Sequence, residues 1–188
     1  AGTAGAVTIT DTTGTVAFQG ATSITTLTTT NQPYNVSFTG ATTDVTNDAN
    51  FLNTGTVTFG DGGDVLTFAG GLATTGNARN PGTVNVGGTV RTNGTQMDLG
   101  AITLTANSSL ETNNTVAAGA TMNAGAVTGA GFTLNLNGGT GGAITMASGD
   151  NISTLTITDS GSIDLSTGVA TTSPKGTPVA SPTHGGVT

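Results

Sequence analysis

The sequence predicts an all-β fold, a right-handed β-solenoid (β-helix) of short stacked strands, and three observations point to it. Threonine and β-branched residues, which suit a pleated and half-buried surface, fill short runs throughout the chain. The 31 glycines punctuate these runs and permit the turns that end one strand and begin the next. Aromatic residues make up only 4% of the chain. The interior is therefore expected to be thin and built from small aliphatic side chains and threonine methyl groups.

Alternating apolar residues mark the expected strands, because residues two apart in a strand share one face. In chain order the apolar pairs are Val7 with Ile9, Val16 with Phe18, Ile24 with Leu27, Val36 with Phe38, Val57 with Phe59, Leu66 with Phe68, Val84 with Val86, Ile102 with Leu104, Leu134 with Leu136, Ile144 with Met146, Leu155 with Ile157, and Ile163 with Leu165. No window shows the sustained i, i+3, i+4 spacing of a helix. Short turns with glycine or asparagine separate the runs, and they are expected at residues 11–14, 60–63, 87–88, 93–94, 137–139, 148–151 and 159–161.

Loose self-similarity favours stacked turns over two packed sheets. The phrases TVTFG (56–60), LTFAG (66–70), GTVNVG (82–87) and FTLNLN (132–137) are variants of one pattern. In a solenoid each turn buries its inward residues against the turns above and below, so small aliphatic residues suffice and outward threonine and asparagine can form ladders. The run 117–127 has side chains too small for a sandwich core. An antiparallel β-sandwich is the alternative, since short strands with polar turns are also typical of that fold.

The composition of the sequence changes near Gly168. Residues 1–168 are expected to form one β-strand-repeat domain. Residues 169–188 carry prolines at a spacing of four, at Pro174, Pro178 and Pro182, and no apolar pair. Proline withholds a backbone donor and favours extended chain, so this segment is expected to be a Pro/Ser/Thr/Gly-rich linker or extended arm.

Charge and composition exclude several classes of partner. Charged residues are 7% of the chain, and the cations Arg79, Arg91 and Lys175 are too few for a nucleic-acid-binding patch. No run approaches the roughly 20 apolar residues of a membrane-spanning helix. The chain has no cysteine, which removes disulfides and thiolate metal sites. We therefore expect no nucleic-acid partner and no membrane span.

The phrases GTVTFG (55–60), TVNVGG (83–88), FTLNLNGG (132–139) and LTIT (155–158) resemble the β-strand-repeat regions of large bacterial surface proteins. The resemblance is strongest to autotransporter passengers, including those of rickettsial outer-membrane autotransporters, and to S-layer-like repeat proteins. The resemblance covers residues 1–168 and lies in composition. It implies an exported, extended β-helical stalk at the bacterial cell surface, used in adhesion or surface coating, and it identifies no binding residue.

One segment has the chemistry of a metal site. Residues 60–66, with Asp61 and Asp64, look like a single degenerate copy of a calcium-binding nonapeptide, and carboxylate and turn-carbonyl oxygens suit Ca²⁺. Such calcium sites need neighbouring copies to complete the coordination shell, and no second copy follows. A tight glycine turn with solvated aspartates is the simpler interpretation. Asp44 and Asp48 are likewise expected to lie at turns.

The function expected from these features is a non-enzymatic structural or adhesive segment of an exported, extracellular protein, acting as a stiff polar β-rod. No catalytic residue is predicted. One alternative is a self-assembling filament or surface-layer subunit joined by edge-strand complementation, and a weaker one is a β-helix polysaccharide-active enzyme. Expected partners are further copies or neighbouring repeats of a longer chain, and a host-surface or glycan ligand. The predicted inward residues are Val57, Phe59, Leu66, Phe68, Val84, Val86, Ile102, Leu104, Leu134, Leu136, Leu155 and Ile157.

Overall fold

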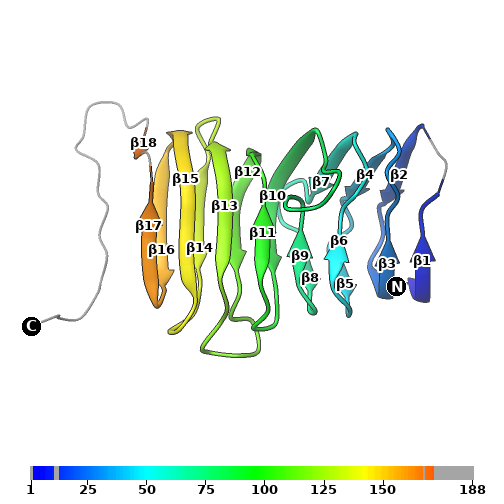
Figure 1. Ribbon diagram of the computed structural model, residues 1–188, viewed down its shortest axis with the longest axis horizontal. Coiled ribbons are helices and arrows are strands. Elements are labelled where there is room, and N and C mark those ends of the chain that lie inside the picture. The colour runs from blue at the N-terminus through cyan, green and yellow to red at the C-terminus, as the bar shows by residue number, and fades with distance from the viewer. Residues whose placement is uncertain (1, 11–12, 167, 172–188) are drawn as a thin grey trace, which may run out of the picture.

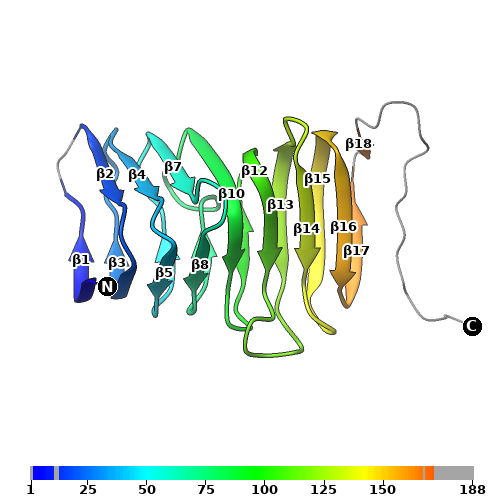
Figure 2. The same cartoon turned by 180° about the vertical axis from the view of Figure 1, so that it is seen from behind.

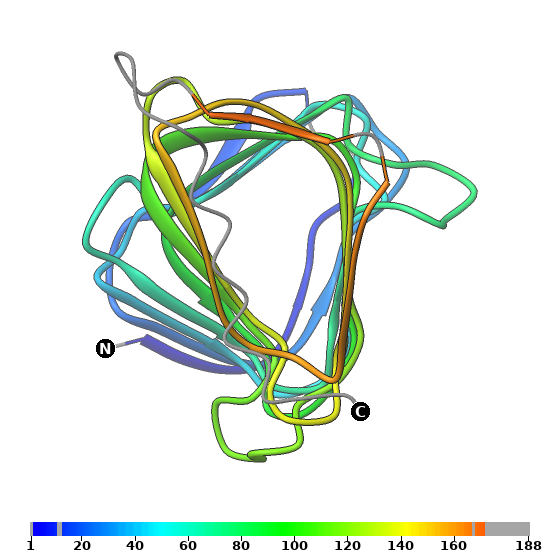
Figure 3. The ribbon, with the colours of Figure 1, turned by 90° about the vertical axis from the view of Figure 1, so that its left-hand side faces the viewer.

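The structure, a computed structural model, describes residues 2–10, 13–166 and 168–171. These residues form eighteen β-strands, which pair in parallel and stack as a β-solenoid of about eight turns. Figures 1 and 2 show the turns side by side along one long axis, and Figure 3, which looks along that axis, shows a rounded triangular cross-section. In this part of the chain there is no helix with the length and apolar character to cross a membrane.

Three faces, each a parallel sheet along the axis, make up the triangle. Face one contains β2 (Thr15–Phe18), β4 (Asn35–Phe38), β7 (Thr56–Phe59), the first part of β10 (Thr83–Arg91), the first part of β12 (Ile102–Glu111), the end of β13 (Met122–Thr128), the end of β15 (Ala143–Ile152) and β18 (Val169–Thr171). Face two contains β1 (Gly2–Thr8), β3 (Thr22–Thr28), β5 (Thr42–Val45), β8 (Val65–Phe68), the second parts of β10 and β12, β14 (Thr133–Asn137) and β16 (Thr154–Asp159). Face three contains the ends of β1 and β3, β6 (Ala49–Asn50), β9 (Leu72–Ala73), β11 (Met97–Leu99), the first parts of β13 and β15, and β17 (Ser162–Leu165).

Register between turns places like residues on top of one another. The inward column of face one runs Val16, Val36, Val57, Val84, Ile102, Val127, Gly149 and Val169. The corresponding column of face two runs Gly2, Thr22, Thr43, Leu66, Val90, Leu110, Leu136 and Ile157. Residues that meet on successive turns are 18 to 27 positions apart, from Val84 with Ile102 to Val57 with Val84. Because the side-chain period of a strand is two, this register keeps every apolar set on the inside.

The interior is a continuous apolar core along the axis, as the sequence predicts. Ten of the twelve predicted inward residues are buried. Leu155 and Ile157 are half-buried and pack against the core from β16, which belongs to the last described turn. These two side chains have a described turn on one side only, and this explains their greater exposure.

Aromatic residues concentrate in the core of the first four turns. The rings of Phe18 and Phe38 stack with centroids 4.9 Å apart, and Phe59 continues the stack beyond Phe38. Phe51 and Phe68 come from the other two faces and meet Phe59 edge-on at 5.3 and 5.4 Å. Offset and edge-to-face pairs add stability beyond their buried area. Phenylalanines from all three faces thus fill the core of these turns.

The all-β solenoid prediction is confirmed, and the antiparallel sandwich alternative is wrong because the strands pair in parallel across successive turns. The predicted turns at 87–88 and 148–151 are also wrong. These residues lie inside β10 and β15, which bend at a corner of the triangle and continue onto the next face. The register of β10 against β12 shifts between Val86 and Gly88, which marks that corner.

Five strands in the repeat region were not predicted, and all of them except the three-residue β11 lack an apolar pair of ordinary size. Strands β6 and β9 are two residues long, and β5 places a buried threonine, Thr43, on the inward side. Strand β11 alternates Met97, Asp98 and Leu99, and β13 uses small residues. At the other end of the chain, Val169–Thr171 forms β18, which pairs with β15. The rest of the predicted arm, 172–188, lies outside the described residues.

Candidate functional surface

The turn between β7 and β8 holds the predicted calcium ligands, Asp61 and Asp64. The backbone N–H of Asp61 donates to Asp64 Oδ2 at 2.9 Å, and this bond closes the turn. Asp64 is 8% exposed, whereas Asp61 is exposed to solvent. Gly60, with φ of 76°, lets the chain enter the turn against Gly87 of the next turn; a Cβ there would lie 1.9 Å from the Gly87 carbonyl oxygen. The glycine turn expected from the sequence is therefore formed.

The two carboxyl groups influence each other. The side-chain hydrogen bond with Asp64, and then electrostatic repulsion from it, raise the pKa of Asp61 above its ordinary value. The site supplies two carboxyl groups, and within the described residues no group of three or more His, Cys, Asp or Glu could hold a metal ion. Calcium binding at Asp61 and Asp64 stays a prediction, and any ion there would rely on turn carbonyls and water for its other ligands.

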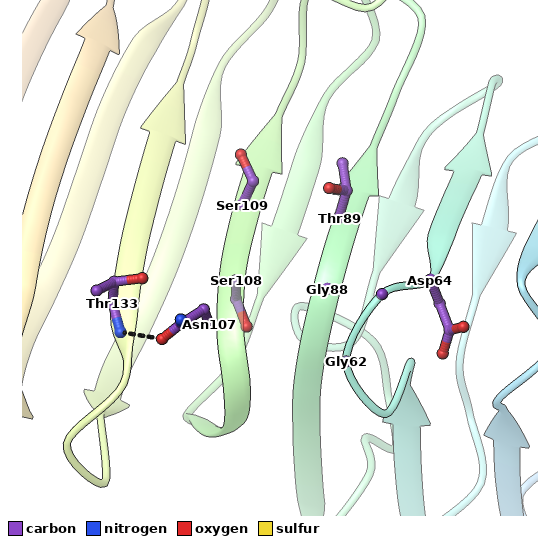
Figure 4. A pocket seen from close by; sticks show the side chains of 9 residues that line it. Gly62, Asp64, Gly88, Thr89, Asn107, Ser108, Ser109 and Thr133 are labelled. Carbon is purple, nitrogen blue, oxygen red and sulfur yellow. Dashed lines mark hydrogen bonds between the residues drawn. The ribbon is translucent and has the colours of Figure 1, made fainter.

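A hollow of about 250 Å³ lies beside this turn, over β8, β10, β12 and β14 (Figure 4). Its lining is made of Gly62, Gly63, Asp64, Gly88, Thr89, Asn107, Ser108, Ser109 and Thr133. Asn107 Oδ1 accepts the backbone N–H of Thr133 at 3.0 Å, which ties the corner before β14 to the turn below it. Gly88 lets β10 pass close to the backbone of this turn, because a Cβ there would lie 2.6 Å from the Asp64 carbonyl oxygen. Hydroxyl, amide and backbone groups dominate this lining.

A second hollow of about 240 Å³ lies on face three, over β6, β9 and β11. Asp48 and Asn50 flank it on one turn, and Gln96 and Asp98 flank it two turns further along. Ala73 stands in register between Asn50 and Asp98 and leaves a notch in the outer row of side chains. Each carboxylate is held by an amide: Asn50 Nδ2 donates to Asp48 Oδ2 at 2.7 Å, and Gln96 Nε2 donates to Asp98 Oδ2 at 2.8 Å.

Asp44 and Asp48 occupy different kinds of position. Asp44 lies in β5 and points outward, so its predicted place in a turn is wrong. Asp48 lies in the corner just before β6, as predicted for a turn residue. The two carboxylates are thus separated by a corner of the triangle, and only Asp48 lines the hollow on face three.

Polar side chains form ladders along the outside of the solenoid. On face three, Asn123 Nδ2 donates to Asp98 Oδ1 at 2.6 Å, and Thr145 Oγ1 donates to Asn123 Oδ1 at 2.7 Å. On face two, Asn135 Nδ2 donates to Ser109 Oγ at 3.0 Å, and Thr158 Oγ1 donates to Asn135 Oδ1 at 2.7 Å. The sequence-based expectation that outward asparagine and threonine bond from turn to turn is confirmed at these positions.

Arg91 lies in the outward row of side chains on face two. Arg91 stands in register between Thr67 and Glu111, and its Nε donates to Thr67 Oγ1 at 3.1 Å. Arg79 is exposed and lies in the loop 74–82. This loop projects outward from the triangle (Figure 3). The two described arginines are therefore on different structural elements, and they do not form a cationic cluster.

The sequence identified the Asp61 turn but neither hollow. Both hollows combine residues from turns about 20 to 26 positions apart, and no local motif reports that spacing. Comparison of the chain with protein-family models, with curated proteins and with solved structures gives no match.

Proposed function

We propose that this chain is a non-enzymatic structural or adhesive segment of an exported bacterial cell-surface protein, in which it acts as a stiff polar rod. The observation that supports this function is the continuity of the inward columns, which run through all the turns on faces one and two. A fold built by repeating one turn extends in one direction, and each turn contacts only its neighbours. Extension in one direction is the property that a stalk needs.

Stiffness would come from three sources that run parallel to the axis. Backbone hydrogen bonds link each turn to the next on all three faces. The apolar core fills the interior, and the outer ladders of asparagine, serine, threonine and aspartate add side-chain bonds between turns. With strands about 4.8 Å apart, eight turns give a rod about 34 Å long between its first and last strands. Bending such a rod would have to disturb all three sets of bonds at once.

The outer surface suits an exported rod that meets water on every face. Its side chains are mainly neutral hydrogen-bonding groups, and the whole chain carries a net charge of −7 with 3 cations. Adhesion would then depend on hydrogen bonds to a polar partner such as a glycan, for which the two hollows offer hydroxyl, amide and carboxylate groups.

Two measurements test the rod function. Small-angle scattering of the purified chain is expected to give the profile of a short rigid cylinder, and antibodies raised against it are expected to label intact cells of the source organism. A compact sphere or a flexible coil in scattering would contradict the rod. Labelling that appears only after the cells are permeabilised would contradict the surface location and leave the rod intact.

A second candidate function is a subunit of a self-assembling filament or surface layer. Apolar side chains that are only partly buried lie at both ends of the core, Val7, Val16 and Phe18 in the first turn and Leu155, Ile157, Leu165 and Val169 in the last. Electron microscopy tests it: the full chain is expected to form ordered polymers, and a variant without residues 1–10 is expected to stay monomeric. Polymers that are unchanged by the deletion would count against a role for β1.

A further inference from the structure

The two ends of the solenoid present surfaces that match in shape. Strands β1 and β2 pair with β3 and β4, which makes them the first turn, and β16, β17 and β18 pair back to β14 and β15, which makes them the last. In a parallel solenoid every turn offers on its upper side the backbone groups that the lower side of the next turn accepts. The upper side of the last turn is therefore complementary to the lower side of the first turn of another copy.

We propose that copies of this chain join head to tail, with the last turn of one copy stacked on the first turn of the next and the inward columns continuing in register. This inference rests on the self-assembling function and specifies its joint. On face one, Val169 would meet Val16 of the next copy, since these two residues end the same column. On face three, Ile163 would meet Val7, which is in register with Leu27.

Apolar burial favours this joint. Val16 and Phe18 are half-buried at the first turn, and Val169 is half-buried at the last. The Phe18 ring is stacked on Phe38 at 4.9 Å through one of its faces, and its partial exposure leaves apolar surface to cover. Head-to-tail stacking would cover the half-buried residues of both ends in the way that interior turns cover theirs.

Polar groups at the rim of the joint are also complementary. The outward row of face two ends at Asp159 in the last turn and begins at Thr3 in the first. The outward row of face three ends at Asp164. It begins at Thr8, because Thr8 is in register with Thr28, and the end of β3 lies against β6 through the bond from Thr29 Oγ1 to the Asn50 carbonyl oxygen.

Carboxylates of one copy would therefore meet threonine hydroxyls of the next. The same chemistry is seen within the chain, where Ser109 Oγ donates to Glu111 Oε1 at 2.9 Å. The described residues of the first turn, 2–10 and 13–18, include no acidic group, so within them no carboxylate faces Asp159 or Asp164. Joining two last turns would instead place Asp159 and Asp164 of both copies at one joint, and repulsion between like charges opposes that arrangement.

Thiol cross-linking tests the register of the joint. The chain has no native cysteine, so only the introduced thiols can react. The variant Val16→Cys/Val169→Cys places two thiols on neighbouring strands about 4.8 Å apart across the proposed joint. Within one chain these two positions lie at opposite ends of the solenoid, so a short bifunctional thiol reagent can link them only between copies. The expected result is a series of covalent dimers, trimers and longer chains on a denaturing gel.

A matched control has its thiols on two different faces. The variant Val16→Cys/Ile163→Cys is expected to give no covalent series, although it has the same number of thiols. If filaments form but the control links as well as the test pair, or if Val16→Cys alone gives dimers, the proposed register is overturned while self-assembly stands. If neither filaments nor links form, both the joint and the self-assembling function are overturned.

A charge substitution gives an independent readout. Thr8→Asp would place a carboxylate opposite Asp164 of the next copy, and it is expected to raise the critical concentration for assembly severalfold at low salt. Thr28→Asp makes the same change in the same row one turn further in, and it is expected to have a smaller effect. Thr8→Lys is expected to lower the critical concentration. Equal effects of Thr8→Asp and Thr28→Asp would overturn the proposed contact.

Discussion

At the scale of single residues, the core of the interior turns tolerates little polarity because each inward side chain there is covered by the turns on both sides. Leu136 is fully buried and lies in register between Leu110 and Ile157. Truncation to alanine is expected to cost about 2–5 kcal/mol, and Leu136→Asp is expected to cost more because it buries a charge without a partner. Urea denaturation followed by circular dichroism measures the loss. Thr156→Asp, on the outer side of β16, is the control, and a comparable loss there would contradict the inward assignment of Leu136.

The Asp61 turn gives a prediction about pH. Because the pKa of Asp61 is raised in the folded chain, the folded state binds its proton more tightly than the unfolded state does. Stability is then greatest below the unfolded pKa and falls as pH rises through the window between the unfolded and folded pKa values. Asp61→Asn is expected to remove this fall, so its melting temperature should slightly exceed that of the parent near neutral pH and match it at about pH 3, below the ordinary Asp pKa. A lower melting temperature of the variant at neutral pH would contradict the argument.

Calcium can be tested at the same turn. If Ca²⁺ binds at Asp61 and Asp64, millimolar Ca²⁺ is expected to raise the melting temperature of the parent chain, because a ligand that binds only the folded state stabilises it. Asp61→Asn would abolish that increase, and Mg²⁺ serves as the control ion. An equal response of parent and variant to Ca²⁺ would rule out the predicted site.

At the scale of elements, strands that continue around a corner depend on particular glycines. Gly88 has φ of 102° inside β10, and a Cβ there would come within 2.6 Å of the Asp64 carbonyl oxygen. Gly88→Ala is expected to destabilise the fold by about 1–3 kcal/mol, because alanine is strained at this φ and would push β8 and β10 apart. Gly63→Ala is the matched control, since a Cβ at Gly63 would meet nothing within 4 Å. Equal losses of stability in urea would contradict this role for the corner.

At the scale of the whole molecule, stability is not expected to be uniform along the axis. Five phenylalanines contact one another in the first four turns, whereas the later turns are filled mainly by aliphatic side chains and methionine, with only Phe132 packed against the core from the side. In a repeat fold, stability is a sum of turn and interface contributions, so local opening follows local packing. Hydrogen exchange is expected to be slowest in β4 and β7 and faster in β16 and β17. The slowest exchange at the last turn would contradict this gradient.

The sequence predicted the architecture well because the features that carry it are local. Pairs such as Val57 with Phe59 and Leu134 with Leu136 alternate within a few residues, and both pairs are buried as predicted. The corners were harder to predict. Gly87 and Gly88 have turn chemistry, yet in the structure they bend a continuous strand, because the backbone there pairs with the turns above and below.

The candidate surface was less predictable for a physical reason. Asp98 and Asn123 are bonded across 25 positions, and Thr133 and Asn107 across 26. The length of a turn varies with the loop at its corner, so the register between turns cannot be counted from a fixed repeat. Thr43 shows the same limit inside the core: it is fully buried in a column that carries leucine and valine from Leu66 to Leu136, and its polarity concealed β5.

Two corner segments, residues 74–82 and 112–121, bulge outward from the triangle (Figure 3), and they belong to the turns with the most residues. The additional residues of these turns thus form outward loops, while the strands on either side keep their partners. Evolution can therefore lengthen, shorten or replace these excursions without retuning the rest of the protein. Because these loops do not affect strand pairing, a foreign peptide could be grafted at 112–121 and displayed at a fixed position along the solenoid axis.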